Sequence, residues 1–497
     1  MRSKNNSVNR SDSNLRSKNI SLLLDENINN VKKALLNSSD LMIRNLEFGN
    51  RKIVVVFIDT LIKSDVLEFQ IIQQIINNPK ETIVDTVAIK DIKISSSFDE
   101  SILALVKGKA VIFTENEASS IILDVALFEN RSIEQPESEQ VLRGAQDGFI
   151  ESLDININLL RRRINNPNLA VKYLSLGRET DTSIAIVYVA SIANDELVKE
   201  VERRISYIDA DYINSIEEYI EDNSYSPFPQ MLTTSRPDRV SANLMDGRVA
   251  VLTDGSPSVL VMPITFFSFY QTSDDYNSRW MIVSFFRLMR LLSFIISISL
   301  PALYIALVSF HFEIIPIELV FNVKSSLEYI PFPPLIEALS MQITLELLRE
   351  SAIRLPSPIS QTLGVVGGLV IGTAVVEANL ISNTMLVVIS VTAISSFATP
   401  DSEMGTSVRL LGFPLMFAAA TIGLIGIVFG LMIILIHLCK LESFGTPYFA
   451  PFAPFRRKDL KDTIYRVPMW KMTERPRSAL PKKLRSAKNS RGWKQNE

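Results

Sequence analysis

The chain has 497 residues, of which 47% are hydrophobic and 21% charged, and its formal net charge at pH 7 is -3. This length leaves room for a soluble region of one or two domains and for a membrane unit. The single cysteine, Cys439, excludes an intramolecular disulfide and a zinc cluster built from cysteines.

The N-terminal segment, residues 1–20, is polar and rich in Asn and Ser, and we expect it to be disordered. It contains no apolar stretch of signal-peptide length, so we expect the first half of the chain to stay on the inner side of a membrane. A first soluble subdomain is expected over residues 21–132. Its hydrophobic periodicity predicts a strand at residues 52–59, a helix at 66–76, and two further strands at 109–114 and 120–128.

An acid-rich connection leads to a second soluble subdomain, expected over residues 140–270. Asp254 and Gly255 lie between two apolar runs there, which predicts a hairpin. The subdomain is predicted to begin with a helix, two strands and a helix, over residues 147–164, 168–176, 183–190 and 195–205. We therefore expect an α+β cytosolic region of the α/β type, made of two small subdomains.

The C-terminal half holds all of the long apolar runs, and we expect an all-α transmembrane domain of four to five helices over residues 280–440. A run of twenty residues forms a helix about 30 Å long, the thickness of the hydrocarbon core of a bilayer. The last run has thirty residues, so it requires tilt or a break at Pro414. The expected spans are residues 291–310, 355–376, 378–400 and 410–439.

Residues 334–354 are predicted to form an amphipathic helix between the first and second spans. It lies in the membrane interface, or its polar face lines a pore. Four spans follow if it does not cross, and this is the count that we favour. If it does cross, there are five spans and the last run must double back. The polar face contains Gln342, Glu346, Arg349 and Glu350.

Residues 441–497 are predicted to form a basic cytosolic tail. Between residues 456 and 494 the tail holds fourteen Lys or Arg against three acidic residues. The positive-inside tendency places this end on the cytoplasmic side, and four spans put both termini there. A basic segment beside a membrane more simply meets anionic lipid headgroups than nucleic acid, so we expect no nucleic-acid partner.

Closely spaced glycines point to helix packing in the membrane half. Two overlapping GxxxG motifs and a third one remove the side chains from one helix face, so another helix can approach. This packing occurs within one chain or between copies in a ring. In a ring, neighbouring apolar residues would form a hydrophobic gate. The glycines are Gly364, Gly368, Gly372, Gly426 and Gly430, and the gate candidates are Val365, Val366 and Val370.

One acid, Glu377, separates the second and third spans, and it either reaches water at a helix end or lines an ion path. A ring of Glu377 or Glu346 side chains would favour cations. Enzyme signatures such as a P-loop, a nucleophile elbow or HExxH do not occur, and the two histidines, His311 and His437, lie near ends of apolar runs. We expect no enzymatic activity, no cofactor and no metal site.

Several long blocks resemble the A-subunit family of spore germinant receptors, the GerA family. They are GFIESLDININLLRRRINNPNL from Gly148, FHFEIIPIELV from Phe310, the block that starts PFPPLIEALSMQITLELLRESAIR at Pro331, and ESFGTPYFAPFAP from Glu442. The resemblance runs from about Asp40 to Pro454.

The resemblance implies a multi-pass protein of the inner membrane of bacterial endospores, acting in nutrient-triggered germination. Its implied partners are a transporter-like B subunit, a lipoprotein C subunit and further copies of the chain, which together with the lipid bilayer would form an ion-conducting homo-oligomer for cation release. On this chain the channel would be built from residues 334–378. The alternatives are a related spore membrane paralogue that amplifies the ion signal without sensing nutrient, a secondary transporter, or a membrane enzyme using acids such as Asp147 and Glu151.

Overall fold

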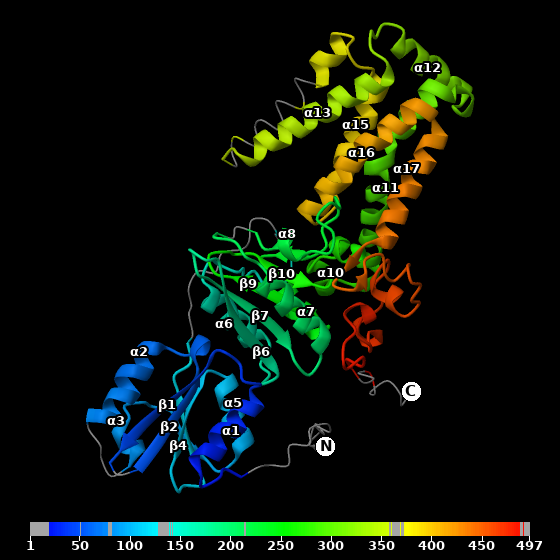
Figure 1. The fold of residues 1–497 in the computed structure, drawn as a ribbon. Coiled ribbons are helices and arrows are strands. Elements are labelled where there is room, and N and C mark those ends of the chain that lie inside the picture. The colour runs from blue at the N-terminus through cyan, green and yellow to red at the C-terminus, as the bar shows by residue number, and fades with distance from the viewer. Residues whose placement is uncertain are drawn as a thin grey trace, which may run out of the picture.

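The computed structural model shows three parts that follow one another in the chain (Figure 1). Two domains, each built on a β-sheet, precede a group of long helices, and the C-terminal segment returns to the second sheet domain. This architecture confirms the predicted fold class. The structure describes residues 19–49, 51–77, 82–127, 139, 141, 143–212, 215–356, 359, 368, 372–487 and 491.

The first domain is a five-stranded antiparallel sheet with helices on both faces, in the strand order β1-β2-β4-β5-β3. Its strands are β1 Leu41–Phe48, β2 Arg51–Ile58, β3 Ile92–Ser95, β4 Lys109–Thr114 and β5 Ser120–Asp124. Its helices are α1 Leu24–Ala34, η1 Asp59–Leu61, α2 Ser64–Val66, the π-helix η2 Leu67–Ile72, α3 Gln73–Asn77, α4 Ile83–Thr86 and α5 Phe98–Val106.

Alternation along β2 explains why this sheet is covered twice. Val54 and Val56 pack with α1 and α5, whereas Ile53 and Val55 pack with η2, α3 and α4 on the opposite face. Successive side chains of a strand point to opposite faces, so an unbroken run of β-branched residues has to be buried on both sides. The run KIVVVFI therefore specifies a central strand between two helical layers.

The second domain repeats this plan, with the strand order β6-β7-β9-β10-β8. Its strands are β6 Leu169–Leu176, β7 Thr182–Val189, β8 Leu232–Thr234, β9 Val249–Thr253 and β10 Val259–Met262. Its helices are α6 Leu153–Arg163, α7 Asp195–Ser206, α8 Glu217–Ile220, α9 Pro237–Met245, η3 Phe266–Tyr270 and α10 Asp274–Asn277. Helices α6 and α9 cover one face, and α7 and α8 cover the other.

Both domains have their strands in the same order, and the repeat extends to a side chain. Asn27 in α1 and Asn156 in α6 are each 1% exposed. Each amide bonds both backbone groups of the residue six positions earlier, Ser21 at 2.9 and 2.7 Å and Ile150 at 2.9 and 2.6 Å. The two asparagines end the similar sequences LDEN and LDIN, a repeat that hydrophobic periodicity does not reveal.

The predicted hairpin at Asp254 and Gly255 is present. It joins β9 to β10, with Gly255 at φ +80°. Residues at positive φ are left-handed, a conformation that glycine adopts without a Cβ penalty. The expected helix at residues 147–164 begins later, at Leu153, because the preceding segment instead bonds to Asn156 and to Ser235.

A buried ion pair joins the two sheet domains. Asp40, just before β1, accepts hydrogen bonds from Arg161 of α6 at 2.6 and 2.7 Å, and both side chains are about 2% exposed or less. The hydroxyls of Ser38 and Thr60 also donate to Asp40, at 2.8 and 3.1 Å. The amide of Ser39 donates to the carbonyl of Val171 in β6 at 2.9 Å. The domains are therefore held by charge and backbone bonds together.

The helical region contains α11 Trp280–Phe310, η4 Phe312–Ile314, α12 Ile317–Leu327, α13 Pro334–Ile353, α15 Asn383–Phe397, α16 Ser402–Ile422 and α17 Leu424–Lys440. Helix α11 packs against α13, α15, α16 and α17. Among the described residues, α11 and α16 are the two helices long and apolar enough to cross a membrane. Helices α15 and α17 are apolar but shorter.

The last apolar run is neither one tilted helix nor broken at Pro414, the two possibilities expected for it. Pro414 lies inside α16, and the chain turns at Gly423, which has a φ of +66°. The run expected as one span over residues 410–439 therefore forms parts of two packed helices, α16 and α17, so it doubles back. A glycine at positive φ commonly ends a helix. A proline is tolerated within a membrane helix, because neighbouring groups can satisfy the backbone carbonyl that it leaves unbonded.

The C-terminal segment folds onto the second domain. It contains β11 Glu442–Ser443, β12 Thr446–Pro447, η5 Asp459–Asp462, η6 Met469–Lys471 and η7 Arg477–Ala479. Lys482 donates to Asp195 at 2.6 Å, and Arg475 donates to the carbonyl of Met245 at 2.6 Å. Within the described residues, the basic tail is thus attached to the protein along much of its length.

Candidate functional site

The polar residues predicted on α13 do not share one environment. Gln342 is 6% exposed, whereas Glu350 is exposed and pairs with Arg354 at 2.5 Å. Glu346 pairs with both Arg349 and Arg409, at 2.7 and 3.0 Å. These residues share one side of α13 at helical spacing, but their burial and their partners differ.

Two guanidinium groups around Glu346 change the charge expected there. Arg349 also bonds the hydroxyl of Ser396 at 2.7 Å and lies over the ring of Phe397, 4.7 Å from its centroid. One carboxylate between two arginines leaves a net positive charge. A ring of such clusters would not attract cations, contrary to what an isolated Glu346 would do.

A buried acid that the sequence analysis did not single out lies on the same helix. Glu337 is 0% exposed and accepts a hydrogen bond from the backbone N–H of Ser382, the N-cap of α15. The hydroxyl of Ser382 lies 3.4 Å from that of Tyr304 on α11. Glu337 thus marks the point where α11, α13 and α15 meet. The sequence signal was an acid on an otherwise apolar turn, PLIEAL.

The glycine motifs fall into two groups. A Cβ added to Gly426 would overlap the carbonyl group of Ala418, and one added to Gly430 would overlap the side chain of Leu415, so α17 lies directly on α16 there. Among the described residues, no atom lies within 4 Å of a Cβ placed on Gly368, and Gly372 meets only Leu386, at 3.9 Å. Gly368 is exposed and meets none of the described residues at this distance.

The remaining predicted site residues are placed less fully. Gly364, Val365, Val366 and Val370 lie outside the described residues. Glu377 is exposed near the turn that precedes α15. Their roles stay predictions.

A charged network joins the sheet domain, α11 and the C-terminal segment. Arg287 of α11 is 1% exposed and donates to Asp275 of α10 and to Asp462 of η5, each at 2.8 Å. The hydroxyl of Tyr276 donates to the other oxygen of Asp462 at 2.8 Å. Arg466 donates to the carbonyl of Ser278 at 3.0 Å. We call these five residues, Asp275, Tyr276, Arg287, Asp462 and Arg466, the junction network.

Electrostatics hold the junction network in one protonation state. Burial and the neighbouring Asp462 raise the pKa of the Tyr276 hydroxyl, so that this group remains a donor at neutral pH. The guanidinium groups of Arg287 and Arg466 lie 5.7 and 5.5 Å from the ring centroid of Tyr276. Each adds a cation–π attraction of about 0.5–2 kcal/mol. The network therefore links the sheet domain, α11 and the C-terminal segment through buried contacts.

Aromatic residues fill the space beside this network. Phe266 of η3 lies 5.3 Å from Phe294 of α11 and 5.7 Å from Phe449, measured between ring centroids. At the end of α17, His437 lies 2.9 Å from the hydroxyl of Ser226 and stacks on Phe228. His437 thus joins α17 to the second domain.

A polar cavity of about 550 Å³ lies next to the junction network. It is lined from three sides, by α9 and the turn that leads to β9, by the segment before α11, and by the C-terminal segment. Burial raises the pKa of Asp246 in its wall to about 6, despite the nearby Arg248. The cavity is within the size range of small-molecule sites, but several of its charged side chains already have partners. Lys458 pairs with Glu474, Arg239 with Glu139, and Asp462 with Arg287.

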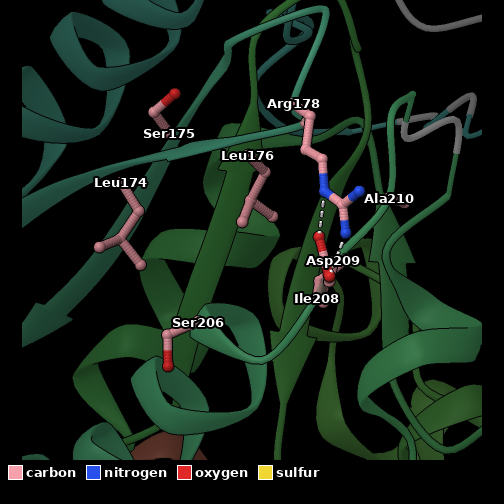
Figure 2. A pocket seen from close by; sticks show the side chains of 9 residues that line it. Leu174, Ser175, Leu176, Arg178, Ser206, Ile208, Asp209 and Ala210 are labelled. Carbon is pink, nitrogen blue, oxygen red and sulfur yellow. Dashed lines mark hydrogen bonds and ion pairs between the residues drawn. The ribbon is translucent and has the colours of Figure 1, made fainter.

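A second hollow, of about 310 Å³, lies between the β6–β7 turn and the end of α7. Figure 2 shows Arg178 and Asp209 facing each other across it, joined by the hydrogen bonds drawn there, one of 2.6 Å. The guanidinium of Arg178 holds the pKa of the Asp209 carboxyl below its usual range. Both side chains are more than 60% exposed, so the pair adds little stability and no convergent catalytic group is present.

Within the described residues, no group of three or more His, Cys, Asp or Glu side chains is placed to hold a metal ion. The main feature of this region is instead the connection between its parts. A two-domain soluble region is bonded through the junction network to a group of apolar helices, and one acid is buried among these helices.

Comparison with known proteins gives one family model, described as "Bacillus/Clostridium GerA spore germination protein", which matches residues 29–478. The chain is similar to "Spore germination protein KA" of Bacillus subtilis (strain 168), with 38% identity over 95% of this chain and 90% of that protein. It is 42% identical to "Spore germination protein A1" of the same organism, over 74% of this chain and 77% of that protein.

Two further similarities accompany these. The "Uncharacterized membrane protein YfkQ" of Bacillus subtilis (strain 168) is 38% identical over 92% of this chain and 91% of that protein. A crystal structure of the N-terminal domain of the A subunit of the Bacillus megaterium spore germinant receptor GerK3 matches with 26% identity and a TM-score of 0.40, covering 50% of this chain and 98% of that chain.

Proposed function

The chain belongs to the GerA family of spore germination proteins, and on this basis we propose that it is the membrane subunit of a germinant receptor complex that conducts cations during nutrient-triggered germination. The observation that carries the proposal is the junction network. It ties a soluble two-domain region to apolar helices through buried charges, as a gated membrane protein requires.

In this proposal the helices work as an oligomer in the inner membrane of the spore. The exposed position of Gly368 supports contact between copies, since a helix face without side chains permits close approach. The B and C subunits implied by the family would receive the nutrient and pass the signal to the soluble domains. The helical region begins at Trp280 and ends at Lys440, and both of these ends lie on the side that faces the second domain (Figure 1). This arrangement supports the placing of both termini on the cytoplasmic side.

The test of conduction is cation release from dormant spores in which this gene is replaced by a variant. Substituting Val365 or Val366 by Ala, at normal protein level, should release cations without nutrient, because a smaller side chain weakens a hydrophobic gate. Release that stays nutrient-dependent and unchanged in rate would refute the gate at these positions.

The test of assembly uses the single native cysteine. In a Cys439→Ser background, Gly368→Cys should give disulfide-linked dimers upon mild oxidation in membranes. Phe417→Cys, which is half exposed on α16, serves as the matched control. Equal cross-linking of both variants would refute a contact specific to the Gly368 face.

A signal-amplifying paralogue is the second candidate. The similarity to the membrane protein YfkQ favours this candidate, because YfkQ is not named for germination. It is 38% identical to this chain, the same value as spore germination protein KA. Such a paralogue would conduct cations only after another receptor has been triggered. Spores that keep this chain as their single GerA protein would then fail to respond to any nutrient.

A further inference from the structure

The carboxylate of Glu337 is incompletely satisfied in the helical region. Its Oε1 accepts the backbone N–H of Ser382, whereas its Oε2 is buried and has no hydrogen-bond partner among the described residues. Within that part of the chain, none of the ion pairs includes Glu337. A carboxylate that is 0% exposed therefore depends on one N–H group and on the N-terminus of α15.

That support is too weak for a full negative charge. A helix N-terminus acts as about half a positive charge and falls off within one turn. An ionised carboxylate removed from water without a counter-charge costs several kcal/mol, so such groups are paired, metal-bound or neutralised. By contrast, Glu346 on the same helix has two arginine partners. Glu337 therefore requires either a proton or a counter-charge, and the described side chains provide no counter-charge.

Two hydroxyls, those of Tyr304 and Ser382, lie at the same meeting point of α11, α13 and α15. The Oγ of Ser382 also accepts the backbone N–H of Met385 at 3.1 Å. Tyr304 and Ser382 face each other at 3.4 Å, a long separation for two hydroxyls. Unpartnered buried acceptors in a native structure indicate a missing proton, water or ion.

The chemistry of these groups selects the kind of ion. They are the oxygens of one carboxylate and two hydroxyls, which suit hard cations, and among the described residues no cluster of nitrogen or sulfur ligands for a transition metal is present. One carboxylate balances one charge. A divalent cation would retain an excess positive charge in an apolar surrounding, so a monovalent cation fits better.

We propose that Glu337, with the oxygens of Ser382 and Tyr304, binds a monovalent alkali cation between α11, α13 and α15. Its role in conduction rests on the function proposed above, but the binding does not. The site differs from the acids that the sequence favours, since Glu346 is already paired and Glu350 and Glu377 are exposed.

A plain helix-capping role predicts a different outcome for one conservative change. Glu337→Gln keeps an oxygen that accepts the N–H of Ser382 but removes the charge. If Glu337 only caps α15, this variant should retain every property of the wild type. If Glu337 binds a cation, the variant should lose cation dependence while remaining folded, because it no longer buries a charge.

The experiment is thermal unfolding of the purified full chain in detergent, with KCl or NaCl titrated against choline chloride at constant ionic strength. The wild type should show a saturable rise in Tm, on the order of 2–4 °C, as the alkali cation replaces choline. Glu337→Gln should show no such rise. Glu350→Gln, an exposed acid on the same helix, is the matched control and should behave as the wild type.

Three results would overturn the proposal: no alkali-dependent rise in the wild type, the same rise in Glu337→Gln, or a Tm that follows pH and ignores the cation, which would mean that Glu337 carries a proton. Cation flux into liposomes separates the two proposals. Alkali-dependent stabilisation without flux would keep the site and refute conduction. Flux without such stabilisation would refute the site and leave conduction standing.

Discussion

Replacing Arg161 by Met is the sharpest test of how the two sheet domains are joined. The substitution keeps most of the side-chain volume and removes the guanidinium that contacts Asp40 at 2.6 and 2.7 Å. Asp40 would remain buried, with only the hydroxyls of Ser38 and Thr60 as donors. We expect a large destabilisation, confined at first to the boundary between the domains.

The size follows from the energetics of buried charges. Removing one partner of a buried ion pair costs about 3–5 kcal/mol because the other charge is left uncompensated. The two remaining hydroxyl bonds to a charged group offset part of this, so we expect a value near the lower limit, about 3 kcal/mol. At 1.4 kcal/mol per factor of ten, opening of the boundary should become roughly a hundredfold more frequent.

Hydrogen exchange of the full chain, read by mass spectrometry, measures this opening. The amide of Ser39 bonds Val171 across the boundary, so peptides containing it should exchange about a hundredfold faster in Arg161→Met, by the reasoning above. The exposed neighbour Arg162 supplies the control, and Arg162→Met should stay within about 0.5 kcal/mol of the wild type.

A double substitution separates the charge from the contact. Asp40→Asn combined with Arg161→Met removes both charges, so it should cost less than the sum of the two single changes. If Arg161→Met exchanges no faster than Arg162→Met, or if the two single effects simply add, the ion pair does not hold the domains together and the reasoning is refuted.

Three further changes test other parts of the structure. Gly426→Ala should destabilise the α16–α17 pair by about 1–3 kcal/mol, because the added Cβ overlaps the backbone of α16, and a lower Tm in detergent measures this. Gly368→Ala should be neutral or stabilising in the monomer. Equal effects of the two substitutions would contradict the packing described. Asp246→Asn should abolish a loss of stability that the wild type shows as pH rises from about 4 through 6. The folded pKa of about 6 lies above the usual 3.8, so the stabilisation is complete when Asp246 is protonated and is lost as it ionises; thermal unfolding between pH 4 and 8 measures this, and a wild type that gains stability over that range would exclude the assignment. Arg287→Met should release the C-terminal segment, so that trypsin cleaves it faster than in the exposed control Arg279→Met, and unchanged cleavage would show that the junction network does not hold it.

Local pattern was enough for many of the elements. The strand predicted at residues 109–114 is present as β4 with the same bounds, and the helix predicted at 195–205 is present as α7, Asp195–Ser206. Both have a clear period in their apolar residues, which depends on neighbours in the sequence alone. The strand β8 was missed because three residues are too short to show a period, whereas α1 was missed although Leu24, Ile28 and Val31 repeat at helical spacing.

The repeat of the two domains was within reach of the sequence. The signals LDEN at Leu24 and LDIN at Leu153 place an asparagine at the same point of equivalent helices. The aspartate and asparagine look like ordinary polar residues on a helix surface until their backbone partners are known. A search for internal similarity, rather than for periodicity, would have found the pair.

Hydrophobicity, periodicity and charge act over a few neighbouring residues, so the amino-acid sequence alone indicates a charged α+β half, an apolar helical half and a basic end. Which charges meet depends on the fold. Arg161 and Asp40 are 121 residues apart, and Arg287 and Asp462 are 175 apart, so their pairing depends on how whole domains pack. The same holds for Glu337. Its burial follows from the packing of three helices, while Glu346, nine residues later, finds two arginines that the fold brings to it.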